Sequence, residues 1–466
     1  MGRTGNITPG GAPEIGLSGD ALHERLLREG DAHRRLGRLW RYYRNPEVGR
    51  DNAGRVRVAQ EEGLPARLRT AALPDDRSPA PEVVIENDIG WRIDAMVDFM
   101  LGGPVTLLSM AAQEERRRAI GRVLDVAFEA SGGAALLHEW LLTGAVSGVG
   151  DLLVRADALF DDRTGDALAG ARRVRIEVVA PERATAILDP NDWRRLLAYA
   201  VCAEREAGAG EREPVVELWT ASRHRVWVGG RPVRDAVNAL GVVPVVHVQN
   251  RRQPLRYRGV SDVEGLIPLQ DELNTRMSDR AHRVTMQSFR MYLAKGVEGF
   301  GSGGVRIGPG QVWSTDNLEA SVEAFGGDAR SPSEDAHVEQ IRQALDKASS
   351  VTPVAAGVIR ERIGQLSSEN ALRITFTGLL ARTARKQQAY GRGLQDAAAL
   401  VLRALAISGH FATTDDERQV RVEWPEPLPL SERERLEAAL KKTELGVSRE
   451  QILAELGYGP GDPGIV

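Results

Sequence analysis

Cysteine is almost absent from this sequence of 466 residues, in which Cys202 is the single thiol. One cysteine cannot form an intramolecular disulfide or a multi-cysteine zinc site, and this scarcity suits a reducing compartment. We interpret Cys202 as a small buried apolar residue rather than as a reactive thiol.

Long apolar runs and an excess of one charge are also missing. The best candidate for a membrane span, 135–150, is interrupted by His138 and Glu139, so no span is predicted. Residues 1–19 have no apolar signal-peptide region and predict a flexible arm rich in glycine and proline. With a formal net charge of -4, the chain is neither a strongly basic nucleic-acid-binding protein nor an acidic tail protein.

Motifs for catalysis and metal binding are scarce as well. The eight histidines are scattered, and none forms a pair with metal-ligand spacing. The glycine-rich segment 299–310 lacks the lysine of a phosphate-binding loop and predicts turns. Asp157, Asp161 and Asp162 could hold magnesium in a metal-dependent nucleic-acid enzyme, but an exposed hairpin loop is the preferred interpretation. We therefore predict no catalytic residue, no metal site and no cofactor, and keep such an enzyme as an alternative.

The sequence does contain clear helical and strand periodicity, and 42% of its residues are hydrophobic, enough for a core. Residues 45–85 are rich in Gly, Pro, Arg and Asp and predict a loop. A β-rich region includes a hairpin over 223–233 with a Gly-Gly turn, and a short strand over 241–250 that Pro244 places at a sheet edge. The predicted helices cover 20–44, 87–107, 112–130, 133–147, 331–350 and 368–407.

Pro268 lies inside a helical pattern, where a proline normally costs about 3 kcal/mol. Ser261 and Glu264 form a capping box that predicts a short lead-in helix to about Ile267. A kink at Pro268 would then place it in the first turn of a new helix, where its missing N–H is harmless. This helix should run to about Tyr292, so that the proline marks a joint between a body and a projecting rod.

Three segments, in this order and spacing, resemble the portal proteins of tailed bacteriophages. They are GVVPVVHVQNRR (241–252), GVSDVEGLIPLQDELN (259–274) with MQSFRMYLAKG (286–296), and SSENALRITFTGLLARTARKQQAYGRGLQ (367–395). Each is moderately specific alone, and their order makes the resemblance strong. It covers about 240–405 well, is loose over 85–240 and at the tail, and is absent for 1–80.

The resemblance implies an α+β, mostly α, portal fold with four parts: a wing of helices plus a β-sheet, a two-helix stem, a small clip containing β structure and a helical crown. The implied boundaries are 20–258 and 367–430 for the wing, 259–292 and 333–350 for the stem helices, 293–332 for the clip, 351–366 for a tunnel loop and 431–466 for the crown.

The resemblance also implies a function without catalysis. Portal proteins form a homo-oligomeric ring of about a dozen subunits at one capsid vertex, and double-stranded DNA passes through it, independent of sequence, during packaging and ejection. The implied partners are the terminase large subunit, a head–tail adaptor, and the major capsid and scaffold proteins, with no membrane. The protein is then expected in the virion, after assembly in the host cytoplasm. A helical virion adaptor without a channel is a further alternative.

Candidate site residues follow from the implied parts. The tunnel loop offers small or apolar residues for a constriction and two arginines for phosphate: Thr352, Val354, Val358, Ile359, Arg360 and Arg362. An ordinary connecting loop with buried valines is the alternative. Val312 and Trp313, on a hairpin predicted over 303–314, could dock the motor or an adaptor, unless Trp313 packs the clip core.

Arg276, Arg280 and Arg283 recur at helical spacing on the first predicted stem helix, beside Asp279. We interpret them as surface charges paired between neighbouring subunits, with contact to DNA as the alternative. A strongly basic channel lining would trap DNA, since each neutralised phosphate strengthens binding. The near-neutral net charge therefore suits a channel in which DNA slides.

Overall fold

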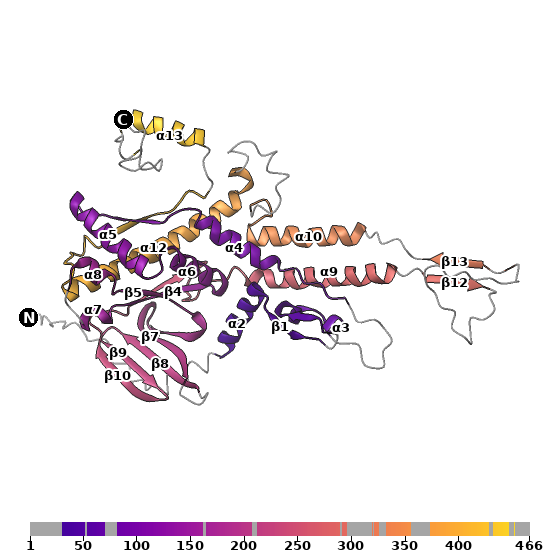
Figure 1. The fold of residues 1–466 in the computed structure, drawn as a ribbon, viewed down its shortest axis with the longest axis horizontal. Coiled ribbons are helices and arrows are strands. Elements are labelled where there is room, and N and C mark those ends of the chain that lie inside the picture. Colours follow the sequence, from indigo (N-terminus) through magenta and orange to yellow (C-terminus); the bar gives the residue numbers. More distant parts are fainter. Residues whose placement is uncertain are drawn as a thin grey trace, which may run out of the picture. The chain divides into compact units, whose positions relative to one another are not determined.

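The computed structural model combines helices and sheets, as predicted (Figure 1). It describes residues 30–51, 54–69, 82–161, 165–206, 212–288, 291–295, 319, 321–325, 332–355, 373–427, 432–446 and 452. The chain divides into two compact units. Unit 1 comprises Met1–Leu36, Arg92–Asp262 and Ser350–Val466, and unit 2 comprises Gly37–Trp91 and Val263–Ser349.

Amphipathic helices supply much of the core of unit 1. In α5 the buried residues Ile120, Val123, Leu124, Ala127 and Phe128 recur at helical spacing and form one apolar face. The predicted helices over 87–107, 112–130, 133–147 and 368–407 are confirmed in kind, although the first ends earlier. The observed helices are α4 (Asp88–Met100, whose first four residues belong to unit 2), α5 (Glu114–Ala130), α6 (Gly133–Ser147), α7 (Asp157–Asp161), α8 (Ala167–Ala171), α12 (Thr377–Ser408) and α13 (Glu432–Glu444).

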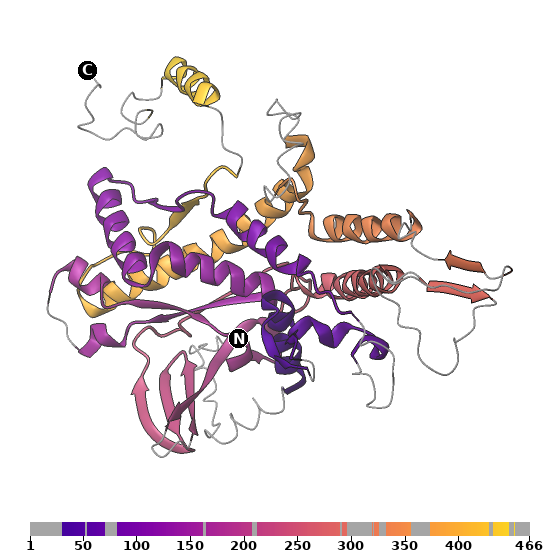
Figure 2. The same ribbon diagram turned by 45° about the vertical axis from the view of Figure 1, so that its right-hand side comes forward.

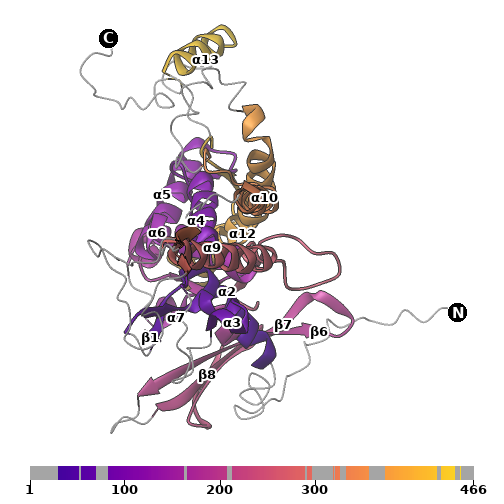
Figure 3. The ribbon, with the colours of Figure 1, turned by 90° about the vertical axis from the view of Figure 1, so that its right-hand side faces the viewer.

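Three antiparallel sheets accompany these helices in unit 1. One has the strand order β10-β9-β8-β7-β6, of which β8, β7 and β6 are labelled in Figure 3, the second β11-β4-β5, and the third β14-β3. The strands are β3 (Thr106–Ser109), β4 (Val149–Arg155), β5 (Arg175–Val179), β6 (Ala184–Asp189), β7 (Asp192–Glu206), β8 (Arg212–Thr220), β9 (Arg223–Val228), β10 (Arg231–Val237), β11 (Val245–Gln249) and β14 (Val420–Glu423).

Two sequence predictions for these sheets are confirmed. The β9–β10 hairpin turns at Gly229 and Gly230, whose φ angles of 53° and 77° require glycine-like freedom. Strand β11 follows Pro244 and is the outer strand of its sheet, paired with β4 alone.

A close approach of α6 to α12 holds unit 1 together. The rings of Trp140 and Tyr390 meet edge to face, with centroids 4.9 Å apart. A Cβ at Gly144 would lie 1.8 Å from the Tyr390 hydroxyl oxygen. Glycine is therefore required at this position because the tyrosine occupies the space of a side chain.

Gly144→Ala should lower the free energy of unfolding of unit 1 by about 1–3 kcal/mol, as overpacking of a filled core does. The methyl group would displace the Tyr390 hydroxyl, which donates to Asn250 Oδ1 at 3.2 Å. Gly121→Ala is the matched control, since nothing lies within 4 Å of its Cβ position in α5; it should stabilise by about 0.5–1 kcal/mol. Urea unfolding of both variants measures the difference, and equal midpoints would contradict the argument.

Unit 2 is built around two long helices, α9 (Ile267–Ser288) and α10 (Pro332–Ser349), which lie side by side (Figure 2). Between them in sequence, β12 (Met291–Lys295) pairs antiparallel with β13 (Ser321–Phe325). The N-terminal part of the unit contains most of α2 (Gly30–Arg44), β1 (Glu47–Arg50), β2 (Val56–Val58), the 3-10 helix η1 (Ala59–Gly63) and α3 (Ala66–Arg69).

Pro268 is the second residue of α9, so the prediction that it lies in the first turn of a helix is confirmed. The predicted lead-in is present only as a single 3-10 turn, η3 (Glu264–Leu266), directly before α9. Its predicted cap is wrong, because Val263 rather than Ser261 is the N-cap. The Ser261 hydroxyl instead donates to the Val146 carbonyl oxygen at 2.6 Å. The helix also ends before Tyr292, which lies in β12.

Two further predictions are wrong. Residues 45–85 are not simply loop, because β1, β2, η1 and α3 lie among them. The stretch that begins at Asp157 is not a hairpin loop but the short helix α7. Within the described ranges, no helix has the length and apolarity that crossing a membrane would need.

Candidate functional site

The helix pair α9–α10 of unit 2 has a conventional apolar seam. Val338, Ile341 and Leu345 of α10 are buried at spacings of three and four residues, and Leu273 of α9 is fully buried. Residues at this spacing share one helical face, so the two helices can pack along their length.

A row of buried polar side chains follows a second face of α9. Gln270, Asn274 and Ser278 recur every four residues and have no exposed surface. We call these three residues the polar ladder. Each accepts one backbone N–H from the segment that leads into α4 or from the first residue of α4: Gln270 Oε1 from Asp88 at 3.0 Å, Asn274 Oδ1 from Glu86 at 3.1 Å and Ser278 Oγ from Val84 at 3.0 Å.

The spacing of the polar ladder has a simple geometric cause. Four residues of helix rise about 6 Å, and two residues of extended chain advance about 6.6 Å. Every second residue of 84–88 therefore meets every fourth residue of α9. The ladder fixes both the position and the register of this segment on the helix.

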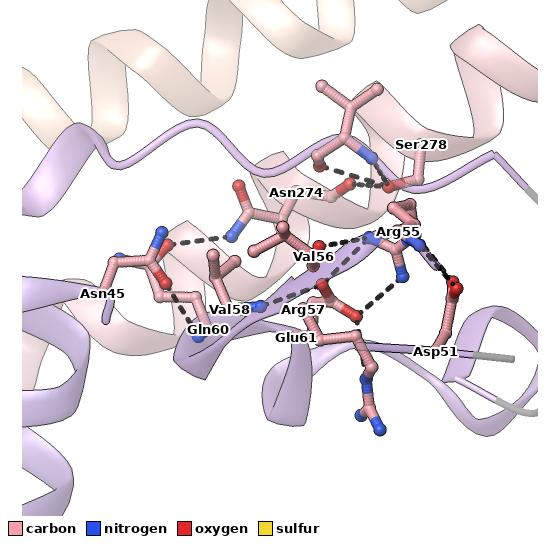
Figure 4. A network of polar contacts seen from close by, with 11 residues as sticks. Asn45, Asp51, Arg55, Val56, Arg57, Val58, Gln60, Glu61, Asn274 and Ser278 are labelled. Atoms are coloured by element: carbon pink, nitrogen blue, oxygen red, sulfur yellow. Dashed lines mark hydrogen bonds and ion pairs between the residues drawn. The ribbon is translucent and has the colours of Figure 1, made fainter. Parts of the chain in front are cut away.

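Gln60 extends the ladder toward the N-terminal elements of unit 2 (Figure 4). Its Oε1 accepts from Asn274 Nδ2 at 3.1 Å, and its backbone N–H donates to Asn45 Oδ1 at 3.0 Å. Its Nε2 donates to the Tyr42 carbonyl oxygen at 2.7 Å and to Asn87 Oδ1 at 2.8 Å. The fully buried Gln60 side chain thus joins η1 to three other parts of the chain, at Tyr42, Asn87 and Asn274.

Glu61 is held next to Gln60 by arginines from the β1–β2 hairpin (Figure 4). Arg55 binds it through two N–O contacts of 3.0 Å, and the Val58 N–H donates to it at 3.1 Å. Burial opposes the charge of Glu61, but these hydrogen bonds outweigh it and lower the pKa of the carboxyl group. The hairpin is therefore fixed by charge as well as by backbone pairing.

The three arginines singled out on α9 have acidic partners within the same chain. Arg276 binds Glu272 at 2.7 Å and Asp279 at 3.4 Å, on its own helix. Arg280 binds Asp335 of α10 at 2.9 Å, and Arg283 binds Glu334 of α10. The ion pairs of Arg280 and Arg283 therefore join α9 to α10. Neither contact between subunits nor contact with DNA is tested by this geometry, and both stay predictions.

In unit 1, a buried cluster surrounds the last residue before the chain enters unit 2. The Asp262 side chain is fully buried and accepts from Lys386 Nζ at 2.5 Å, from Arg382 Nη2 at 2.5 Å and from Asn250 Nδ2 at 2.8 Å. Arg251 Nε lies 3.4 Å from the same carboxylate. We call these five residues the anchor cluster.

The electrostatics of the anchor cluster favour an ionised Asp262. Burial alone would favour the neutral acid, but Lys386 and Arg382 outweigh it and hold the pKa of Asp262 well below its usual range. Burial lowers the pKa of Lys386, against the attraction of Asp262. The backbone is fixed too, since the Asp262 N–H donates to the Ala145 carbonyl oxygen at 2.8 Å. The chain therefore leaves unit 1 from a rigid point.

Other predicted site residues are placed only in part. Thr352 and Val354 are half-buried, and Thr352 Oγ1 accepts from the Ala355 N–H at 3.3 Å. The remaining tunnel-loop and clip candidates lie outside the described residues: Val358, Ile359, Arg360, Arg362, Val312 and Trp313.

The acidic cluster considered for magnesium is not assembled in the described part of the chain. Asp157 pairs with Arg234 at 3.4 Å, and its carboxylate lies 3.7 Å from His224 Nδ1. Asp162 lies outside the described residues. Among the residues that are described, no three His, Cys, Asp or Glu side chains are grouped as a metal site would require.

Comparison with known proteins decides the family. The family model for "Phage portal protein, SPP1 Gp6-like" matches residues 93–457, more than half of the chain. This protein belongs to that portal family. It is thus a viral portal protein, a structural component of the virion and of the head–tail connector. The family is structural rather than enzymatic.

Solved structures give a weaker likeness to this portal protein, and no curated protein matches it significantly. The neck of an empty GTA particle computed with C6 symmetry has 14% identity and a TM-score of 0.49, over 79% of this chain and 90% of that one. The neck of the native GTA particle computed with C12 symmetry has 14% identity and a TM-score of 0.45. The virion of the native gene transfer agent particle has 12% identity and a TM-score of 0.44. Each of these two matches covers 79% of this chain and 89% of the other chain.

Proposed function

We propose that this portal protein assembles into a closed ring of about a dozen copies at one capsid vertex. Double-stranded DNA passes through the centre of the ring during packaging and ejection, without recognition of its sequence. The observation that carries this proposal is the family match over residues 93–457. The packed helix pair α9–α10, with the β12–β13 excursion between the two helices in sequence, supports it.

The parts of the portal fold are assigned to the chain as follows. α9 and α10 form the stem, and the β12–β13 pair belongs to the clip that projects the docking residues Val312 and Trp313. Unit 1 supplies most of the wing, and α13 belongs to the crown. Residues 351–366 form the tunnel loop that touches DNA.

The arginines of α9 are paired with carboxylates, and this pairing favours a channel that does not bind DNA tightly. A protein that neutralises six to ten phosphates changes its affinity by roughly 10³–10⁵ across ordinary salt concentrations, and a ring multiplies every contact. Arg276, Arg280 and Arg283 already have carboxylate partners in their own chain. A stem built from such pairs presents little uncompensated positive charge to a sliding duplex.

The energy for DNA movement then comes from a separate ATPase, the terminase large subunit, which docks at the clip. A head–tail adaptor and the major capsid and scaffold proteins are the other proposed partners. The protein itself needs no cofactor and resides in the virion after assembly in the host cytoplasm.

Negative-stain images and native mass measurement of the purified protein test the ring. We expect rings with a central hole and a mass of about a dozen 50.7 kDa chains. Monomers at high concentration, both alone and after co-expression with the scaffold and capsid proteins, would contradict the proposal. Compact closed oligomers without a hole would favour an adaptor that has no channel.

A further inference from the structure

Within the part of the chain that the structure describes, one edge of strand β11 has no partner strand. Val154 N–H donates to the Pro244 carbonyl oxygen at 2.9 Å, and Asn250 N–H donates to the Gly148 carbonyl oxygen at 3.0 Å. In an antiparallel pair the residues that exchange hydrogen bonds alternate along the strand. The even-numbered residues 244–250 therefore face β4, and Val245, His247 and Gln249 turn their backbone N–H and C=O groups outward.

These outward groups have no backbone partner within the described residues. Strand β11 pairs with β4 alone, and no turn or loop hydrogen bond reaches the backbone of Val245, His247 or Gln249. Such a row of free donors and acceptors is a template for another strand, and proteins normally cover, shorten or charge it. The outward residues Val245, His247 and Gln249 include no lysine, arginine, carboxylate or proline.

The free edge opens into a groove of about 770 Å³ within unit 1. α12 forms one wall, and it can approach because residue 393 is glycine: a Cβ there would lie 2.5 Å from Val248 Cγ2. The start of β7 forms the other wall with Trp193 and Leu196. A groove with an unpaired strand along its floor and apolar walls fits an extended peptide.

The charge of the groove selects an acidic peptide. Arg194 and Arg252 line it, and neither forms an ion pair with a described residue. The Arg194 guanidinium lies over the Trp193 ring, with its carbon 5.0 Å from the centroid. The third arginine, Arg392, pairs with Asp396 at 3.3 Å. Two guanidinium groups are thus left to attract carboxylates.

We infer that the groove binds the protein's own N-terminal segment, residues 4–22, as an added strand beside β11. The segment has Glu14 and Asp20 but no Lys or Arg, and Ile15 and Leu17 would share one face of an extended chain. Residues 23–29 link this segment to α2 and could span roughly 23 Å at about 3.3 Å per residue, toward the groove of the same copy or of a neighbour. The inference does not depend on ring formation.

Amide hydrogen exchange of the full-length protein tests this inference residue by residue. Occupancy should slow exchange at Val245, His247 and Gln249, and removal of residues 2–22 should speed it at least roughly tenfold. Val246 and Val248 bond to β4 and should stay protected in both proteins. A synthetic peptide of residues 4–22 should restore protection, whereas the same peptide with Glu14→Lys and Asp20→Lys should not.

A variant that lacks residues 458–466 is the matched control, because that tail also lies outside the family match. It should leave the exchange of all five β11 amides unchanged. Fast exchange at the three outward amides of the full-length protein would overturn the inference, since the groove would then be empty. Protection that survives removal of 2–22 but disappears with the C-terminal tail would overturn it as well.

Discussion

Asp262→Ala is expected to lower the free energy of unfolding of unit 1 by about 3–5 kcal/mol, the range found when one partner of a buried ion pair is removed. The substitution leaves Lys386 and Arg382 buried without the carboxylate that both contact at 2.5 Å. It also removes the acceptor of Asn250. Because Asp262 ends the unit 1 segment Arg92–Asp262, the same change should loosen the point from which the chain continues into η3 and α9.

Urea unfolding at neutral pH measures this loss. Asp415→Ala is the matched control: Asp415 also binds an arginine, Arg418 at 2.6 Å, but its side chain is 95% exposed. Removal of an exposed pair changes stability by about 0–1 kcal/mol. Equal effects of the two substitutions would show that burial of the anchor cluster contributes nothing beyond surface pairing.

The direction of the pKa shift of Asp262 predicts how the stability difference between the wild-type protein and Asp262→Ala depends on pH. Asp262 has a lowered pKa in the folded state, so its contribution is fully present above its unfolded pKa of about 3.9. It is lost only as the pH falls through the lower folded value. The gap between the wild-type protein and Asp262→Ala should therefore stay constant from pH 7 to about pH 5 and narrow only below pH 4. If the difference in free energy of unfolding disappeared near pH 6, a group other than Asp262 would be responsible for it.

Local chemistry was enough to predict many elements of the fold. The helix α5 follows from apolar periodicity, and the β9–β10 turn follows from its two glycines. Pro268 was placed in the first turn of α9 because its missing N–H leaves few alternatives. Each of these predictions depends on residues within a few positions of one another.

Long-range polar contacts were beyond such reasoning. Gln60 and Asn274 are 214 positions apart, and Asp262 and Lys386 are 124 apart. Strands β1 and β2 have only four and three residues, too few for a periodicity to stand out. They are fixed instead by tertiary contacts of η1, which override weak local preference. The spacing of Gln270, Asn274 and Ser278 along α9 was the one available signal of the polar ladder.

The family match begins at residue 93. The segment 84–88 and Gln60 lie before that point, whereas the ladder residues on α9 lie inside it. Buried polar side chains therefore fix the N-terminal elements of unit 2 to α9. We expect the position of these elements to depend on those side chains.

Asn274→Ala should lower the free energy of unfolding of unit 2 by roughly 3 kcal/mol, because each buried polar group left without a partner costs about 1–3 kcal/mol. The substitution deprives the Glu86 N–H and Gln60 Oε1 of partners at 3.1 Å. Gln270 Nε2, which donates to Asn274 Oδ1 at 3.0 Å, loses one of its acceptors. Residues 45–87 should then be cut by a protease at least tenfold faster than in the wild-type protein.

Thr275→Ala is the control one position along α9. Thr275 is also buried, but its hydroxyl donates only within its own helix, to the Asp271 carbonyl oxygen at 2.7 Å. Alanine is the better helix former, so the loss should stay below about 1 kcal/mol and proteolysis of 45–87 should be unchanged. If Asn274→Ala unfolded unit 2 at the same urea concentration as Thr275→Ala, the polar ladder would be a consequence of packing between α9 and the N-terminal elements. If Asn274→Ala is destabilised more than Thr275→Ala by the expected amount, the ladder is the cause of that packing. Of the two side chains, only Asn274 bonds to the N-terminal elements.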